Sequence, residues 1–340
     1  MIRPDLNDIP SYVPGARVDD TLKLSSNETT QPPLTAVQKA LADALATTNR
    51  YPDMGATALR DGLAAHLDVP ATQVAVGTGS SALCQQLVQI TTSPGEEVLF
   101  PWRSFEAYPI FAQVVGARPV AIPLTSTGHH DFDALAAAIT DKTRLIFVCS
   151  PNNPSGRVTT TAQFDAFMTR VPENVLVALD EAYYEYNRDP EAVDGRDVTA
   201  RYRNVVALRT FSKAYGLAGL RVGYAFGPEP IIDALNKVAI PFGVSSLAQA
   251  AALESLSHPD ELAARVEETV RARELVVDKL GTAETQGNFV WLPDVDSQAI
   301  ATALAAEGVL VRAFDEGVRI TVTDRAEAEI LINAWKEAQL

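Results

Sequence analysis

The stretch TFSKAYGLAGLRVGY, residues 210–224, places Lys213 and Arg221 among glycines, small residues and apolar residues. Its composition predicts burial, and an unpaired charge inside a protein is costly. The segment continues the apolar run VVALRTF (205–211), which has the composition of a strand in a covered sheet. Two cations at the end of such a strand therefore call for a group that neutralises or masks them.

Six more β-rich runs lie between positions 73 and 227, and helix-length amphipathic segments separate most of them. The seven runs are VAVG, EVLF, PVAI, RLIFVCS, VLVALDEAY, VVALRTF and VGYAFG, and helical spacing occurs in 80–91, 105–115, 131–139 and 160–170. Near-continuous apolar strands separated by helices are typical of a mostly parallel sheet covered on both faces. We expect an α/β fold with a mostly parallel, seven-stranded sheet.

The pattern changes near AIPFGVSS (239–246), where a proline and a glycine interrupt it. Helices are expected at 245–257, 259–280, 297–307 and 325–338, and strands in NFVWL, VLVRAF and GVRITV. The first 25 residues have no core of their own and are expected to pack onto this part. We predict a large domain, 28–240, and a smaller α+β domain made of 1–27 together with 241–340.

Composition excludes several classes of function. The chain has 340 residues, of which 47% are hydrophobic, and a formal net charge of −15, which argues against nucleic acid and anionic membranes as partners. No apolar run approaches membrane-spanning length, and the N-terminus has no signal-peptide pattern. Cys84 and Cys149 lie in apolar segments, which favours reduced thiols and a cytoplasmic location. No cluster of His, Cys and carboxylate residues predicts a metal site.

Ligands of open α/β sheets bind beyond the carboxyl ends of the strands, so the residues that follow each strand are informative. The glycine turn GTGSSAL (77–83) opens a helix and offers free N–H groups to an anion. The other strand ends carry Asn153 in PNNPSG (151–156), Asp180 and Tyr183 in LDEAY, and Ser212 with Lys213. Each feature alone is typical of an ordinary turn or helix cap. Together they indicate one ligand that is anionic at one end, carries a ring nitrogen and reacts with an amine.

Pyridoxal phosphate has these properties. Its aldehyde forms a Schiff base with a lysine whose pKa is lowered by its surroundings. Its ring nitrogen needs a carboxylate to stay protonated, so that the ring acts as an electron sink. Its phosphate needs a helix N-terminus, hydroxyl groups and an arginine. The sequence therefore predicts a pyridoxal phosphate site at the strand ends.

The segments SPNNPSG, LDEAYYEY and TFSKAYGLAGLRVGY resemble those of fold-type I aminotransferases, in the branch that contains histidinol-phosphate and aromatic amino acid aminotransferases. The resemblance covers nearly the whole chain, from SYVPG (11–15) through RYPD (50–53) to GVRITV (317–322). It implies a homodimer with shared active sites and a ping-pong reaction, in which an amino acid gives its nitrogen to the cofactor and a 2-oxo acid then accepts it.

The resemblance also implies residue roles. Lys213 forms the Schiff base and moves the proton between the substrate Cα and the cofactor C4′, and Asp180 pairs with the ring nitrogen. The other implied cofactor contacts are Tyr183 and Asn153 at the ring hydroxyl oxygen; Gly79, Ser80, Ser81, Thr210, Ser212 and Arg221 at the phosphate; Phe105 stacked on the ring; and Tyr51 at the phosphate of the neighbouring subunit. The implied substrate contacts are Arg319 at the carboxylate, with Asn27, Tyr12, Arg312 and Phe242. Two departures from the family pattern, Ser155 for Thr and NETTQ (27–31) for NENP, remove no catalytic group.

Phe242 bears on the choice of substrate. Histidinol-phosphate enzymes tend to read LPYHLS at this junction, with a tyrosine hydroxyl aimed at the substrate phosphate, whereas this chain reads IPFGVSS. Loss of a hydroxyl donor favours an aryl ring over a dianion, so we expect phenylpyruvate-type 2-oxo acids as substrates. The alternatives are a histidinol-phosphate aminotransferase acting on imidazole acetol phosphate, a pyridoxal phosphate decarboxylase, a ligand-sensing domain, and a Phe242 that merely packs the hinge.

Overall fold

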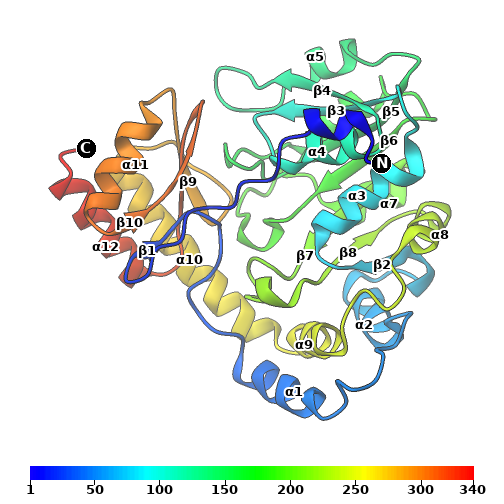
Figure 1. The fold of residues 1–340 in the computed structure, drawn as a ribbon, viewed down its shortest axis with the longest axis horizontal. Coiled ribbons are helices and arrows are strands. Elements are labelled where there is room, and N and C mark those ends of the chain that lie inside the picture. The colour runs from blue at the N-terminus through cyan, green and yellow to red at the C-terminus, as the bar shows by residue number, and fades with distance from the viewer.

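A computed structural model describes all 340 residues and places a seven-stranded sheet at the centre of the larger part of the molecule (Figure 1). The strands are β2 (Val74–Gly77), β3 (Glu97–Trp102), β4 (Arg118–Pro123), β5 (Thr143–Cys149), β6 (Leu176–Asp180), β7 (Val205–Thr210) and β8 (Gly223–Phe226). Their order is β2-β8-β7-β6-β5-β3-β4, and only β8 runs antiparallel to its neighbours. The predicted α/β fold is confirmed, and each of the seven predicted runs forms a strand.

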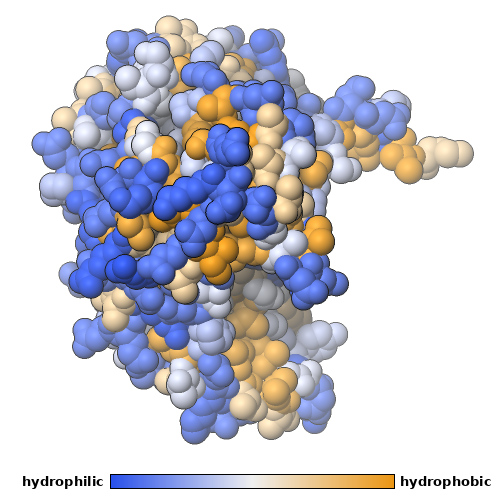
Figure 2. All heavy atoms as spheres, turned by 90° about the vertical axis from the view of Figure 1, so that its left-hand side faces the viewer, coloured by the Kyte–Doolittle hydropathy of each residue, from blue (hydrophilic) through white to orange (hydrophobic).

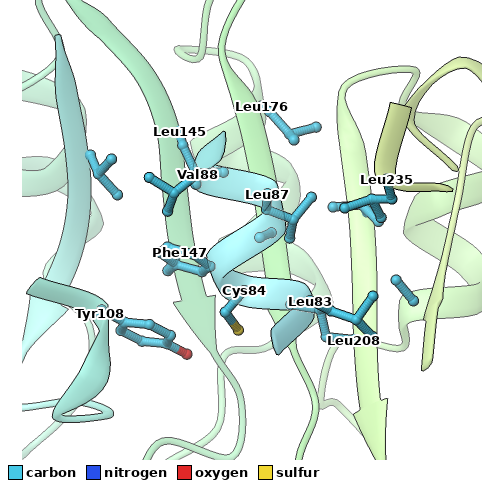
Figure 3. Close-up of a cluster of buried hydrophobic side chains, with 14 of the residues drawn as sticks. Leu83, Cys84, Leu87, Val88, Tyr108, Leu145, Phe147, Leu176, Leu208 and Leu235 are labelled. Carbon is cyan, nitrogen blue, oxygen red and sulfur yellow. The ribbon is translucent and has the colours of Figure 1, made fainter. Parts of the chain in front are cut away.

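Both faces of this sheet are buried, which explains the continuous apolar runs. Along β5, Leu145, Phe147 and Cys149 point into one apolar cluster, whereas Ile146 and Val148 point into another, as the alternation of a strand requires. Figure 3 shows α3 lying across the first face with its apolar side chains directed at the strands. The helices of the larger part are α1 (Thr35–Leu45), α2 (Thr57–Leu67), α3 (Ser80–Thr91), α4 (Ala107–Val114), α5 (Phe132–Ala137), α6 (Thr161–Met168), α7 (Gly195–Arg201) and α8 (Glu229–Val238).

A second, antiparallel sheet forms near the C-terminus, in the order β11-β12-β9. Its strands are β9 (Phe289–Pro293), β11 (Arg312–Phe314) and β12 (Gly317–Thr321), and the helices beside it are α10 (Pro259–Leu280), α11 (Ser297–Ala306) and α12 (Arg325–Glu337). Residues from α10, α12, β9 and β12 share one apolar cluster, which is separate from the clusters of the large sheet. This part of the chain thus has its own core.

The N-terminal segment runs between the two sheets (Figure 1). At its start, the 3₁₀ helix η1 (Pro4–Asp8) lies near α4, because Arg3 Nη2 donates a 2.9 Å hydrogen bond to the carbonyl of Val114. Further along, β1 (Leu22–Lys23) pairs in parallel with β10 (Val309–Leu310). The segment therefore contacts both parts of the molecule and places residues 25–27 between them.

Helix α9 (Ser246–Leu256) follows the large sheet in the chain and packs against α1 and α2. Small side chains make this close packing possible: Ala248, Ala251 and Ala252 are buried in the same cluster as Leu59 and Leu63 of α2. Three further 3₁₀ helices are η2 (Ala71–Gln73), η3 (Tyr184–Tyr186) and η4 (Ala218–Leu220). The start of the predicted small domain thus lies on the helical layer of the large one.

The face that carries α11 and α12 is mainly hydrophilic, with scattered apolar areas (Figure 2). None of the helices combines the length and the apolar character needed to cross a membrane. Cys84 and Cys149 are both buried and free, and no group of three or more His, Cys, Asp or Glu side chains is arranged to hold a metal ion.

Candidate active site

A cavity of about 420 Å³ lies at the carboxyl ends of the central strands, where the N-terminal segment and β12 approach the large sheet. Most of the residues singled out in the sequence line it: Tyr12, Asn27, Ser80, Ser81, Phe105, Asn153, Asp180, Tyr183, Thr210, Ser212, Lys213, Arg221, Arg312 and Arg319. Gly79, Tyr51 and Phe242 are the exceptions. Residues as far apart in the sequence as Tyr12 and Arg319 thus meet in one cavity.

Lys213 lies just after β7, with its amine directed at the cavity. Its Nζ donates a 3.3 Å hydrogen bond to the carbonyl of Ser26, whereas the nearby carboxylate of Glu28 pairs with Lys23 at 2.7 Å. Burial lowers the pKa of the amine to about 7, and the positive charges of Arg319 and Arg221 add to this effect, while Glu28 opposes it. A large fraction of the amine is therefore neutral and nucleophilic near neutral pH.

Asp180 ends β6 at the bottom of the cavity. Its Oδ2 accepts a 2.7 Å hydrogen bond from the hydroxyl of Tyr108, and its Oδ1 accepts a 3.2 Å bond from the N–H of Ala182. Burial raises the pKa of the carboxyl, while these two hydrogen bonds and the charge of Lys213 oppose the rise. The Tyr108 ring is fixed by stacking on Phe147, with centroids 4.3 Å apart. The carboxylate is held rigidly, and a cationic ring nitrogen would satisfy its charge.

A chain of polar groups fixes the phenol of Tyr183. The side-chain amide of Asn27 donates a 2.9 Å hydrogen bond to the Tyr183 hydroxyl. Thr321 of β12 in turn accepts a 2.8 Å bond from the Asn27 backbone N–H and donates a 2.9 Å bond to Asn27 Oδ1. Burial raises the pKa of Tyr183, so the phenol stays protonated at neutral pH and can donate or accept a hydrogen bond.

An anion-binding corner forms where α3 begins. Gly79, at the N-cap, has φ of 82°, and a Cβ there would overlap the guanidinium of Arg221. Arg221 donates to Ser212 Oγ at 3.1 Å and to the carbonyl of Ala218 at 3.0 Å, but it has no carboxylate partner. The first N–H groups of a helix lack intrahelical acceptors and carry partial positive charge. Together with Ser80, these groups suit a phosphate.

Arg319 supplies a second unpaired cation on the opposite side of the cavity. It is only 6% exposed, and it donates 2.7 Å hydrogen bonds to Asn153 Oδ1 and to the carbonyl of Ser25. Its Nε has no hydrogen-bond partner. Burial lowers its pKa, and no carboxylate neutralises it. A buried arginine with a free donor fits a ligand carboxylate.

The outer end of the cavity is apolar on one side and contains an ion pair on the other. Phe105, Ile110 and Phe111 form the apolar wall. Arg312 Nη2 lies 2.9 Å from Glu106 Oε1, so this arginine, unlike Arg319, has a carboxylate partner. The cavity thus has one end that suits a carboxylate and another that is close to neutral.

Tyr51 and Phe242 are not brought to the cavity within one chain. Their rings stack on each other, with centroids 4.7 Å apart and an interplanar angle of 28°. Tyr51 is 82% exposed and Phe242 is 41% exposed, so this aromatic pair faces outward. Their roles in a site shared between two subunits stay a prediction.

Several site residues were missed by the sequence analysis. Tyr108 lies in the first turn of α4, and its ring meets that of Phe105, just before the helix, with centroids 5.4 Å apart, so a second aromatic three positions after Phe105 could have indicated it. Thr321 follows Arg319 at the two-residue spacing that puts side chains on one strand face, which is a usable signal as well. The carbonyls of Ser25 and Ser26 leave no trace in the side-chain pattern, because a backbone group serves there.

Comparisons with known proteins agree with this geometry. A family model described as "Aminotransferase class I and II" matches residues 19–334. The aromatic amino acid aminotransferase of Corynebacterium diphtheriae is 61% identical, over 98% of this chain and 98% of that protein. The protein of the same name from Corynebacterium glutamicum is 62% identical, over 99% and 98%. The solved histidinol-phosphate aminotransferase of Sinorhizobium meliloti, in complex with pyridoxal 5′-phosphate, has a TM-score of 0.90 at 26% identity, over 99% of this chain and 97% of that one.

Proposed function

The chain belongs to the aminotransferase class I and II family and is a pyridoxal phosphate-dependent transaminase, and from this premise we propose that it transfers amino groups to and from aromatic 2-oxo acids such as phenylpyruvate. The observation that carries the proposal is the apolar wall of Phe105, Ile110 and Phe111 facing a near-neutral outer end of the cavity. An aryl ring buries apolar surface there, whereas a dianion finds no free cation. The names of the relatives that are about 60% identical support the same substrate class.

We propose that the residues of the cavity hold the cofactor as follows. Arg221, Ser212 and the N-terminus of α3 bind the phosphate, with Gly79 leaving room for the guanidinium. Asp180 pairs with the ring nitrogen, and Tyr108 keeps that carboxylate in place. The remaining cofactor contacts in this proposal are Ser80, Ser81 and Thr210 at the phosphate, Phe105 on the ring face, and Asn153 with Tyr183 at the ring hydroxyl oxygen.

The chemistry is proposed to proceed on the same groups. Bound pyridoxal phosphate supplies an electron sink that lowers the barrier to removing the proton from the substrate Cα. The neutral amine of Lys213 takes that proton, and its lowered pKa suits both taking and returning it near neutral pH. Arg319 grips the substrate carboxylate by a bidentate contact, with Asn27 close to the reacting end.

A second candidate, histidinol-phosphate aminotransferase, is favoured by the likeness to the Sinorhizobium meliloti structure and by the presence of Tyr12 and Arg312 at the cavity. The test compares kcat/KM for phenylpyruvate and for imidazole acetol phosphate, with a panel of amino donors, in the wild type and in Phe242→Tyr. We expect the wild type to prefer phenylpyruvate, and the added hydroxyl to raise the relative rate with the phosphate substrate about tenfold to a hundredfold. A wild type that prefers imidazole acetol phosphate refutes the aromatic assignment.

We also propose that the active enzyme is a homodimer with shared sites. The outward-facing pair of Tyr51 and Phe242 has the exposed neighbours Met54 and Ile240, and such a set of apolar side chains is typical of an interface. In this arrangement Tyr51 reaches the cofactor phosphate of the other subunit, and Phe242 approaches the far end of a substrate. The division into domains 28–240 and 1–27 plus 241–340, and a cytoplasmic location supported by the two free thiols, complete the proposal.

A further inference from the structure

We propose that Glu106 determines specificity: by pairing with Arg312 it keeps the outer end of the substrate cavity neutral and thereby disfavours substrates that carry a second anionic group. This inference rests on the proposed function, because it deepens the choice between an aryl ring and a dianion. The disfavoured class includes phosphate-bearing and dicarboxylic 2-oxo acids alike, because the argument depends on charge.

Both terminal nitrogens of Arg312 already donate hydrogen bonds. Its Nη2 donates to the two Glu106 oxygens at 2.9 and 3.1 Å and to the carbonyl of Val13 at 2.7 Å, and its Nη1 donates to the carbonyl of Pro14 at 3.1 Å. The side chains of Arg312 and Glu106 are 13% and 25% exposed, so water screens the pair only partly. An incoming anion would have to replace a carboxylate that is already in place and would then remain beside its negative charge.

The two arginines of the cavity therefore differ in availability. Arg319 has no carboxylate partner and a free Nε, so it fits the one carboxylate that all amino acids and 2-oxo acids share. Arg312 is paired with the carboxylate of Glu106. At the end of the cavity away from Arg221, Arg319 is therefore the one arginine that is free to bind a substrate carboxylate. A substrate with an uncharged side chain matches this arrangement.

Local structure does not require a glutamate at position 106. The residue is the N-cap of α4, yet its side chain makes no capping hydrogen bond to that helix. Instead it extends across to β11, where Arg312 lies. The carboxylate therefore acts on the cavity and on the junction between the two parts of the chain, and these two actions can be separated by experiment.

A second ion pair joins the same two segments and provides a matched control. Arg103, three residues before Glu106, donates to Glu316 from Nε at 2.7 Å and from Nη2 at 2.9 Å. Glu316 lies in the turn between β11 and β12, close in sequence to Arg312, and neither partner lines the cavity. Glu316→Gln therefore weakens the junction without changing the charge of the cavity.

The experiment uses calorimetry on the holoenzyme to measure the dissociation constants of two ligands. The first is 3-phenylpropanoate, which has one carboxylate and an aryl ring, and the second is glutarate, which has two carboxylates. We expect Glu106→Gln to improve glutarate binding relative to 3-phenylpropanoate by about tenfold, since it removes one negative charge and frees Arg312. The gain should disappear in the double variant Glu106→Gln/Arg312→Gln, and Glu316→Gln should leave the ratio within about twofold of the wild type.

The same variants are then assayed for kcat/KM with imidazole acetol phosphate and with phenylpyruvate. The ratio of the first value to the second should rise in the variant in which glutarate binding improves relative to 3-phenylpropanoate. An unchanged binding ratio in Glu106→Gln, an equal change in Glu316→Gln, or a gain that persists without Arg312 overturns the proposal. A failure of the proposed function gives a different result from a failure of this inference. The wild type would then not turn over aromatic 2-oxo acids, but the two dissociation constants would still show the effect of the Glu106 charge.

Discussion

Replacing Lys213 by methionine should make the cofactor-free protein harder to unfold, although it should abolish transamination. The amine has a pKa of about 7 in the folded chain against an ordinary value of 10.5, so at neutral pH it is largely charged when unfolded and half neutral when folded. This difference in pKa lowers the free energy of unfolding by at most about 4 kcal/mol at pH 7. Because the amine faces a cavity that admits water, we expect about 2 kcal/mol to be recovered in Lys213→Met.

The sign of the pH dependence follows from proton counting. Between about pH 7 and pH 10.5 the unfolded chain binds more protons at this lysine than the folded chain does, so the wild type becomes more stable as the pH rises. The penalty is fully present below pH 7 and disappears above 10.5. The advantage of Lys213→Met should therefore be largest near neutral pH and shrink on the alkaline side.

Urea unfolding of the two cofactor-free proteins at about pH 6.5, 8 and 9.5 measures this difference in the free energy of unfolding. Lys237→Met is the control, because that side chain is 72% exposed and should give nearly the same small effect at every pH. If Lys213→Met is no more stable than the wild type at about pH 6.5, or if its advantage does not shrink by about pH 9.5, burial does not lower the pKa of this amine.

Three further predictions concern the neighbouring groups. Tyr108→Phe removes a hydrogen bond that lowers the pKa of Asp180, so cofactor retention, followed by absorbance during dialysis, should fail at a higher pH than in the wild type. Gly79→Ala should weaken cofactor binding at least about tenfold by equilibrium dialysis, because the added Cβ meets the guanidinium beside it; unchanged binding would contradict the described corner. Mixing inactive Lys213→Ala with inactive Tyr51→Ala subunits should restore up to about a quarter of the activity if the sites are shared, and none if they are not.

The strand-end groups were predictable because the topology of the sheet constrains them. Parallel strands end at one edge, so Asp180 at the end of β6 and Lys213 after β7 had to lie close together once both segments were recognised as strands. Helices α1 and α2 were not predicted, because both precede the first strand of the large sheet and so lie outside the alternation of strands and helices.

The rest of the site depends on contacts that sequence spacing does not encode. Glu106 lies next to Phe105 in the chain, but its pairing with Arg312 arises only when α4 and β11 meet in the folded molecule. The roles of Ser25 and Ser26 are carried by carbonyl oxygens, which every residue has. For Tyr51 and Phe242, one chain shows a stacked pair on the surface and leaves their part in catalysis as a prediction.

The short pairing of β1 with β10 has a consequence for the order of folding. It joins Leu22 and Lys23 to Val309 and Leu310, far later in the chain, and it places residues 25–27 so that they contact Lys213, Tyr183 and Arg319. The strands of the seven-stranded sheet, which carries Asp180 and precedes Lys213, pair over shorter separations in the sequence. Contacts between distant positions close longer loops and cost more chain entropy. We therefore expect the sheet to form first and the N-terminal segment to complete the cavity afterwards.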